Sequence, residues 1–136
     1  MNLEQAIKYL TSDSIEGLRG NVIGLIGDLG AGKTHFTQSL LEAIDAQLKG
    51  QISSPTYNLC HVYQSKSMEV HHYDLYRIES EDDLFEVGFY DSLEQSNILV
   101  MVEWIDQFPF LQDRCDKLLK IAIMSNNERD YLWLEK

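Results

Sequence analysis

Hydrophobic and polar residues follow one another along this chain in patterns that change between strand-like and helical. Residues 22–26 and 98–102 are short apolar runs, which is typical of central strands covered on both faces. Apolar residues at helical spacing predict a long helix over about residues 34–48. Other expected elements are helices at residues 2–10, 79–87 and 91–95, and strands at residues 57–64, 68–76, 118–124 and 131–134. This order predicts an α/β fold of three layers, in which a mixed parallel and antiparallel central sheet is flanked by helices.

The segment that joins the first strand to the long helix has the pattern of a phosphate-binding loop. It reads Gly-Asp-Leu-Gly-Ala-Gly-Lys-Thr and matches G-x-x-x-x-G-K-[ST], which predicts a P-loop nucleotide-binding fold. Its glycines let backbone N–H groups surround an anion at the positive end of the helix. Lys33 is expected to reach the β- and γ-phosphates, and the Thr34 hydroxyl to bind Mg²⁺. The expected nucleotide-binding residues are Gly27, Asp28, Leu29, Gly30, Ala31, Gly32, Lys33 and Thr34.

Glu103 is the strongest candidate for a catalytic or metal-binding acid. It directly follows the apolar run at residues 98–102, and ligands of open α/β sheets bind at the carboxyl ends of the strands. If this strand runs parallel to the one before the loop, the Glu103 carboxylate lies near Lys33 and Thr34. The alternative is an ordinary solvated glutamate at the end of a strand.

Two further positions carry oxygen ligands in weaker patterns. Asp74 lies in His-Tyr-Asp-Leu-Tyr-Arg, where a surface pair with Arg77 fits the sequence about as well as a role in the site. Thr56 follows Ser-Pro in the loop after the long helix, the position of a segment that senses the γ-phosphate. The alternative for Thr56 is a structural turn, which is the more frequent role of such a tripeptide.

Other conspicuous side chains favour structural roles. His71 and His72 are adjacent, so they point to opposite faces of a strand and cannot readily share a metal ion. His35 and His61 are also expected to be structural. The aromatic residues expected to pack in the core, with contact to a nucleotide or partner as the alternative, are Trp104, Phe108 and Phe110. The acidic run at residues 79–86 is expected to be a solvated helix face, with a docking surface as the alternative.

The composition limits what the nucleotide is used for. With 136 residues the chain is long enough for a single domain, residues 1–136, around one core. Its formal net charge of −11 opposes direct binding to nucleic acid, because such binding depends on Lys and Arg. Cys60 and Cys115 lack CxxC spacing, which indicates a reducing, cytoplasmic setting without a disulfide partner. No apolar run approaches the ~20 residues of a membrane span.

Motifs typical of signalling GTPases and of small-molecule kinases are missing from this sequence. The chain has no Asn-Lys-x-Asp motif and no glycine three residues after an aspartate, which argues against a signalling GTPase. Arginine is scarce, and no arginine-rich stretch resembles the lid with which small-molecule kinases cover their phosphates. An ATPase is the preferred interpretation, with a small-molecule kinase or a non-catalytic nucleotide-dependent binding module as the alternatives.

Four motifs together resemble the TsaE family of small bacterial ATPases, which serve the synthesis of N6-threonylcarbamoyladenosine on tRNA. They are the loop at residues 27–34, Ser-Pro-Thr-Tyr at 54–57, His-Tyr-Asp-Leu-Tyr-Arg at 72–77 and Glu-Trp at 103–104. The resemblance implies ATP and Mg²⁺ as ligands and the TsaD–TsaB enzyme pair as partner. That pair modifies adenosine 37, and the ATPase supports its repeated turnover, so contact with tRNA would be indirect.

The resemblance also implies roles for individual residues. Lys33 matches the phosphate-binding lysine, Thr34 a Mg²⁺ ligand, Thr56 a switch-like loop, Asp74 the metal and water shell, Glu103 a metal-shell or catalytic acid, and Trp104 the aromatic residue beside it. Family members usually begin with a strand and a loop that helps to hold the adenine. This chain starts almost at the first helix, so no adenine contact is assigned. Arg129 is a further candidate for contact with the nucleotide.

Overall fold

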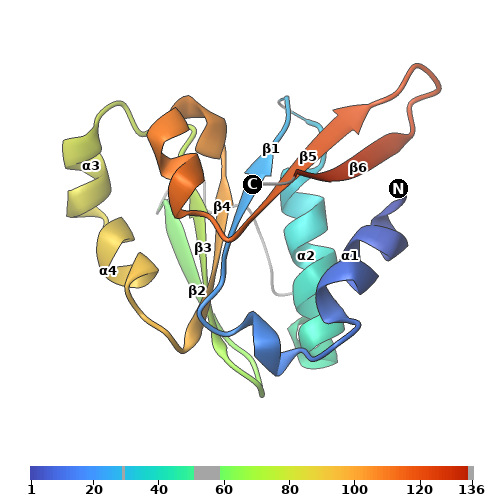
Figure 1. Cartoon of the computed structure of the whole chain (residues 1–136), viewed down its shortest axis with the longest axis horizontal. Helices are drawn as coiled ribbons and strands as arrows, with labels where there is room; N and C mark the ends of the chain where they lie inside the picture. The colour runs from blue at the N-terminus through green and yellow to red at the C-terminus, as the bar shows by residue number, and fades with distance from the viewer. Residues whose placement is uncertain (29, 51–58, 135–136) are drawn as a thin grey trace.

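A six-stranded sheet in the order β2-β3-β4-β1-β5-β6 forms the centre of the molecule (Figure 1). The structure is a computed structural model that describes residues 1–28, 30–50 and 59–134. The four inner strands of the sheet run parallel to one another. They are β3 (Glu69–Asp74), β4 (Ile98–Glu103), β1 (Val22–Ile26) and β5 (Lys117–Ile123). The edge strands β2 (Cys60–Gln64) and β6 (Arg129–Leu134) run antiparallel to their neighbours. The expected mixed sheet is therefore confirmed.

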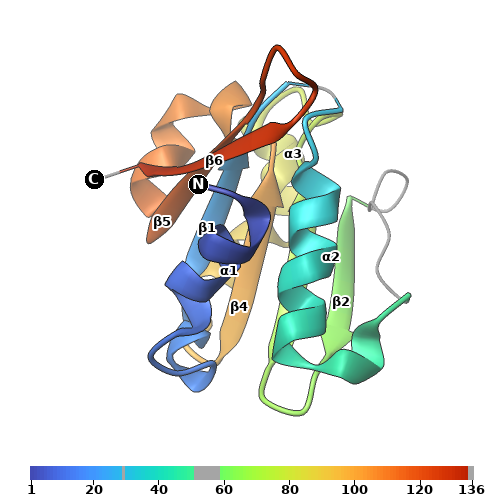
Figure 2. The ribbon, with the colours of Figure 1, turned by 90° about the vertical axis from the view of Figure 1, so that its right-hand side faces the viewer.

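Helices cover both faces of the sheet. α1 (Leu3–Thr11) and α2 (Lys33–Ile44) lie side by side on one face (Figure 2). α3 (Glu81–Glu86) and α4 (Phe89–Leu93) lie on the other face (Figure 1). The three-layer α/β arrangement predicted from the sequence is confirmed, and none of the helices among the described residues is long and apolar enough to cross a membrane.

The unbroken apolar sequence of β4 follows from its place between these layers. Successive side chains of a strand point to opposite faces, so a strand covered on both sides is apolar throughout. Leu99 and Met101 pack into the core under α1 and α2, whereas Val100 and Val102 pack into the core under α3 and α4. All six residues of β4 are buried, including Glu103 at its end.

The long helix predicted over residues 34–48 begins one residue earlier and ends sooner. α2 stops at Ile44 because Asp45 has extended backbone angles, φ −151° and ψ 108°. The Asp45 carboxylate accepts a hydrogen bond from the backbone N–H of Gln47, which starts a separate 3₁₀ helix, η2 (Ala46–Leu48). Aspartate favours such local hydrogen bonds over the helix interior, and this ends the helix.

The other bounds differ from the predictions by a few residues, and some short elements were not predicted. The strand predicted at residues 57–64 starts at Cys60, and residues 57 and 58 lie outside the described residues. The 3₁₀ helices η1 (Glu16–Leu18), η3 (Ile105–Gln107) and η4 (Pro109–Arg114) have no repeating apolar pattern long enough to predict them. Phe110 of η4 was predicted to pack in the core, and this prediction is wrong because its side chain is exposed.

Candidate functional site

A cleft of about 350 Å³ opens where the carboxyl ends of β1, β3 and β4 meet the start of α2. The loop that joins β1 to α2 lies at this edge of the sheet (Figure 2). The cleft is lined by Gly30, Gly32, Lys33, Thr34, His35, Asp74, Tyr76, Arg77, Glu103 and Trp104. The structure therefore brings together the loop, the two predicted acids and the aromatic residue that were named separately from the sequence.

The loop at residues 27–34 has a backbone that requires glycine at more than one position. Gly32, which precedes α2, has φ 108°, in the left-handed region that side-chain-bearing residues rarely adopt. A Cβ atom on Gly27 would lie 2.8 Å from the carbonyl oxygen of Ile121 in β5, so only glycine fits there. The Ala31 N–H donates to the Asp28 carbonyl at 2.9 Å, which closes the turn. Leu29 lies outside the described residues.

Lys33 is a buried cation held by the loop itself. Its ammonium donates hydrogen bonds to the backbone carbonyls of Gly27 and Asp28, the second at 3.0 Å. The same Nζ atom lies 3.7 Å from the centre of the Trp104 ring, within the range of a cation–π contact. Burial lowers the pKa of Lys33, whereas the nearby carboxylate of Glu103 acts in the opposite direction.

The Glu103 carboxylate faces the cleft and is almost completely enclosed. β4 runs parallel to β1 and β3, and its register places Glu103 beside Leu25 and Asp74. The Thr34 hydroxyl lies 3.1 Å from each carboxylate oxygen, and Nε2 of His72 lies 2.5 Å from Oε2. The side chain is only 3% exposed, so an ordinary solvated strand end is excluded.

Asp74 and Trp104 line the cleft on either side of Glu103. Asp74 is buried and accepts a hydrogen bond from the backbone N–H of Tyr76 at 3.0 Å. Trp104 has φ 63°, a conformation that costs a non-glycine residue roughly 1–3 kcal/mol, and it turns the chain directly after Glu103. Its ring packs against Tyr76 at 4.9 Å between centroids, so Trp104 contacts cleft residues as well as the core.

A family model described as "Threonylcarbamoyl adenosine biosynthesis protein TsaE" matches residues 2–131. The chain belongs to the TsaE family. Three similar curated proteins are all named "tRNA threonylcarbamoyladenosine biosynthesis protein TsaE". The Rickettsia typhi protein is 32% identical over 95% of this chain and 88% of its own length. The Rickettsia felis protein is 36% identical over 95% of this chain and 74% of its own length. The Aquifex aeolicus protein is 33% identical over 93% of this chain and 86% of its own length.

Among solved structures, the chain is similar to the crystal structure of YdiB from Bacillus. The two share 22% sequence identity and a TM-score of 0.60, over 98% of this chain and 80% of that one. At this identity the likeness concerns the fold alone. The resemblance to the TsaE family, first drawn from four short motifs, is confirmed by the family model and the relatives.

Two side chains next to the cleft have contacts that the sequence did not specify. His72, which was expected to be structural, contacts Glu103. Arg129 of β6 was expected near the nucleotide, and it donates to the carbonyls of Ala31 at 2.9 Å and Gly30 at 3.3 Å. His71 and His72 do point to opposite faces, as predicted, since Nδ1 of His71 lies 2.7 Å from the hydroxyl of Ser92 in α4.

The oxygen atoms at this cleft suit a hard divalent cation. Mg²⁺ usually takes one or two carboxylates together with waters and substrate phosphates, rather than a complete cage of protein ligands. Thr34, Asp74 and Glu103 offer a hydroxyl and two carboxylates of this kind at one edge of the sheet. No cluster of three or more His, Cys, Asp and Glu side chains that could hold a metal occurs in the described part of the chain. Thr56, a predicted participant, lies outside that part.

Proposed function

We propose that this TsaE-family protein is a Mg²⁺-dependent ATPase. It acts as an accessory subunit of the TsaD–TsaB pair in N6-threonylcarbamoyladenosine modification of tRNA, in the cytoplasm. One observation carries the proposal: Lys33, Thr34 and Glu103 meet at a single cleft, with the hydroxyl 3.1 Å from both carboxylate oxygens. This arrangement joins phosphate binding to a buried acid, which a binding module without chemistry does not require.

Phosphate binding is the task of the loop and Lys33. The N-terminus of α2 presents backbone N–H groups and a partial positive charge to an anion in the cleft. The Lys33 ammonium, now on the carbonyls of Gly27 and Asp28, is within side-chain reach of the same space. A phosphate is a stronger acceptor than a carbonyl, so Lys33 exchanges its loop contacts for the β- and γ-phosphates of ATP.

The three oxygen-bearing side chains serve the metal and the attacking water. Thr34, Asp74 and Glu103 would hold Mg²⁺, which neutralises charge on the phosphates when it is bound. Glu103 accepts a hydrogen bond from the water and orients it toward the γ-phosphate. In phosphoryl transfer most of the catalysis comes from such positioning and charge stabilisation, and little from covalent chemistry by the protein.

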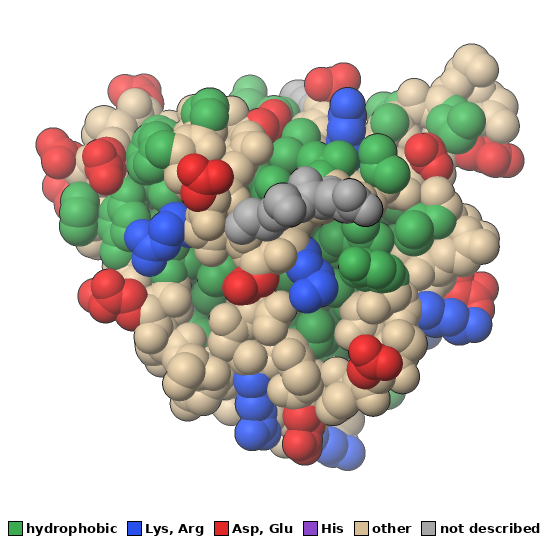
Figure 3. Space-filling view, in the orientation of Figure 1, with side chains coloured by type: hydrophobic (Ala, Val, Ile, Leu, Met, Phe, Trp, Pro, Cys, Tyr) green, Lys and Arg blue, Asp and Glu red, His purple; other side chains and the backbone are tan. Residues whose placement is uncertain are grey.

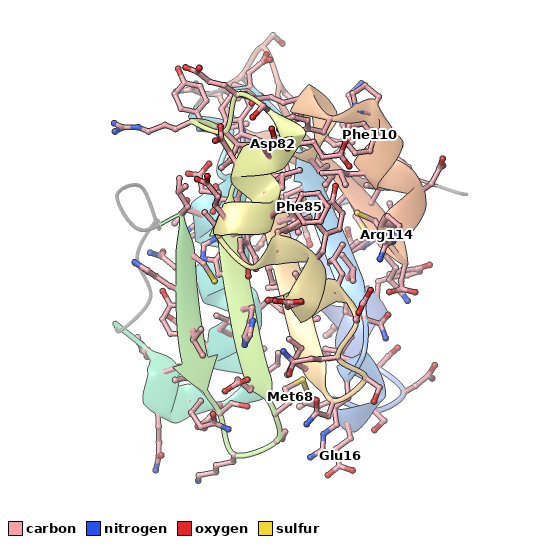
Figure 4. All side chains as sticks on the ribbon, turned by 90° about the vertical axis from the view of Figure 1, so that its left-hand side faces the viewer. Glu16, Met68, Asp82, Phe85, Phe110 and Arg114 are labelled. Carbon is pink, nitrogen blue, oxygen red and sulfur yellow. The ribbon has the colours of Figure 1, made fainter. Side chains whose placement is uncertain are left out.

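The outer surface of α3 and α4 supports a protein partner rather than direct contact with tRNA. Figure 3 shows hydrophobic and acidic side chains next to one another over these helices. Asp82 and the 63%-exposed Phe85 lie on the outer side of α3 (Figure 4). Because acidic side chains repel phosphates, tRNA would be reached only through the partners.

The deciding experiment measures phosphate release from ATP by the purified protein, alone and with the TsaD–TsaB pair. We expect hydrolysis that needs Mg²⁺, prefers ATP over GTP and changes when the pair is added. Equal hydrolysis of both nucleotides, or full activity in EDTA, would contradict the proposal. Phosphate transfer to a small molecule would indicate a kinase, and nucleotide binding without hydrolysis in any mixture would indicate a non-catalytic binding module.

A further inference from the structure

His72 is a buried polar side chain whose ring ends on the Glu103 carboxylate. It comes from β3, is 0% exposed, and places Nε2 at 2.5 Å from Oε2 of Glu103. The register of β3 and β4 pairs His72 with Met101 and Asp74 with Glu103. Since alternate residues of a strand share a face, His72 and Asp74 project to the same side of the sheet as Glu103.

Only one of the two ring nitrogens of His72 is engaged. Within the described residues, Nδ1 is buried and has no hydrogen-bond partner. A carboxylate oxygen accepts hydrogen bonds, so this contact assigns a proton to Nε2, which is donated to Glu103. The ring therefore has one polar contact that fixes its orientation, and that contact is with the acid of the cleft.

The two partners of Glu103 differ in what else they can bind. The Thr34 hydroxyl has a single proton shared between two carboxylate oxygens, and in the proposed function its oxygen also binds Mg²⁺ through a lone pair. His72 is locked in the core and keeps its contact. Because Thr34 lies equally far from both oxygens, whereas Nε2 of His72 contacts Oε2 alone, His72 is the partner that limits the rotation of the Glu103 carboxylate.

We propose that His72 is a positioning residue, whose Nε2–H group holds the Glu103 carboxylate in the orientation that serves ATP hydrolysis. This inference rests on the role of Glu103 in the proposed function. Removing a residue that hydrogen-bonds to a metal-ligating side chain typically lowers activity or metal affinity about 10–100-fold.

A matched pair of amides separates positioning from packing. In His72→Gln the amide nitrogen can occupy the position of Nε2 and can donate to Glu103. In His72→Asn the shorter side chain places its amide nitrogen at the position of Nδ1, away from Glu103. We expect His72→Asn to lower kcat for ATP hydrolysis about 10–100-fold with little change in KM. His72→Gln is expected to restore most of that loss. Equal losses in both variants at equal melting temperature, or normal kcat in His72→Asn, would overturn the proposal.

A second measurement does not depend on hydrolysis. In the ¹⁵N spectrum of the histidine side chains of the free protein, we expect His72 to be protonated at Nε2. The signal should shift in Glu103→Gln, because the acceptor changes from a carboxylate to an amide oxygen. Protonation at Nδ1, or no shift, would overturn the proposal. If the wild-type protein does not hydrolyse ATP, the proposed function fails, and this spectrum still decides whether His72 holds Glu103.

Discussion

Lys33 is the side chain whose removal is expected to weaken nucleotide binding most. Its buried ammonium faces a cleft with the carboxylates of Glu103 and Asp74 nearby, so without it these acids would repel an incoming phosphate. In Lys33→Ala we expect ATP affinity, measured by calorimetry, to fall about 10–100-fold, the worth of one charge-assisted hydrogen bond. The exposed Lys49→Ala makes the same change in net charge and serves as the control. Affinity within twofold of wild type would contradict a phosphate-binding role.

Glu103 allows binding and chemistry to be separated at one residue. Glu103→Gln keeps the shape of the side chain and an oxygen that can accept from His72, but removes the charge. We expect hydrolysis to fall by ~10²-fold or more, the scale of a positioned acid–base group, while ATP binding changes much less. Phosphate release and calorimetry on the same preparations check this, with the exposed Glu94→Gln as control. A variant that hydrolyses ATP normally would leave Glu103 with a structural role only.

Individual site residues could be predicted from the sequence where they belong to a contiguous motif or directly follow a recognisable strand. The loop is a contiguous motif, and Glu103 directly follows an apolar strand, so both could be named before the fold was known. His72 and Arg129 could not be placed in this way, because their contacts depend on strand register and on a hairpin far along the chain. The only local hint for His72 is its spacing of two from Asp74, which puts both side chains on one face.

The element that supports the loop at residues 27–34 is β6. Its Arg129 donates hydrogen bonds to the carbonyls of Ala31 and Gly30, two residues of the loop. We expect Arg129→Ala to weaken ATP binding by about 3–10-fold, which corresponds to the free energy of about one hydrogen bond. Without Arg129 the loop is less ordered before ATP binds, and ordering it reduces the binding free energy. Arg129→Lys should recover only part of this, since an ammonium cannot reproduce the guanidinium fork.

Calorimetry on the two Arg129 variants checks this prediction, together with hydrogen exchange of the loop amides. Exchange in the nucleotide-free protein should be faster in Arg129→Ala than in wild type, because the hydrogen bonds from Arg129 are absent. Unchanged affinity and unchanged exchange would mean that β6 does not support the loop.

Elements were predictable where one pattern ran over several residues. The apolar run of β4 and the helical spacing of α2 identified both elements. The start of α3 also has a local cause, because the Ser80 hydroxyl accepts a hydrogen bond from the N–H of Asp83. The end of α2 was predicted too late, since Asp45 stops the helix although apolar spacing continues to Leu48. The 3₁₀ helices after β4 were not predicted, because their turns depend on the path that Trp104 sets.

For the whole molecule, the proposed function leads us to expect docking that is controlled by ATP at the cleft. A bound γ-phosphate and Mg²⁺ commonly order a neighbouring segment, and loss of that phosphate releases it. We expect the TsaD–TsaB pair to bind this protein at least about fivefold more tightly with ATP than with ADP, the lower range of allosteric coupling. Pull-downs with ATP, ADP and no nucleotide measure this.

Equal recovery of the pair in all three nucleotide states would show that the nucleotide does not control docking. The contact surface is tested separately with Phe85→Ser on α3, since Phe85 is 63% exposed and lies outside the cleft. That variant should hydrolyse ATP alone as wild type does and lose recovery with the pair. Normal recovery would place the docking surface elsewhere on the molecule.

The contact between Lys33 and Trp104 also provides the molecule with an optical sensor. Indole fluorescence responds to nearby charge, and the ammonium lies 3.7 Å from the ring centre. A ligand that draws Lys33 away changes the emission of Trp104 without any added dye. The second tryptophan, Trp133, packs beside Tyr9 and Phe36 and does not line the cleft. Replacing Trp133 with phenylalanine would leave Trp104 as the single tryptophan, through which occupation of the loop can be followed in real time.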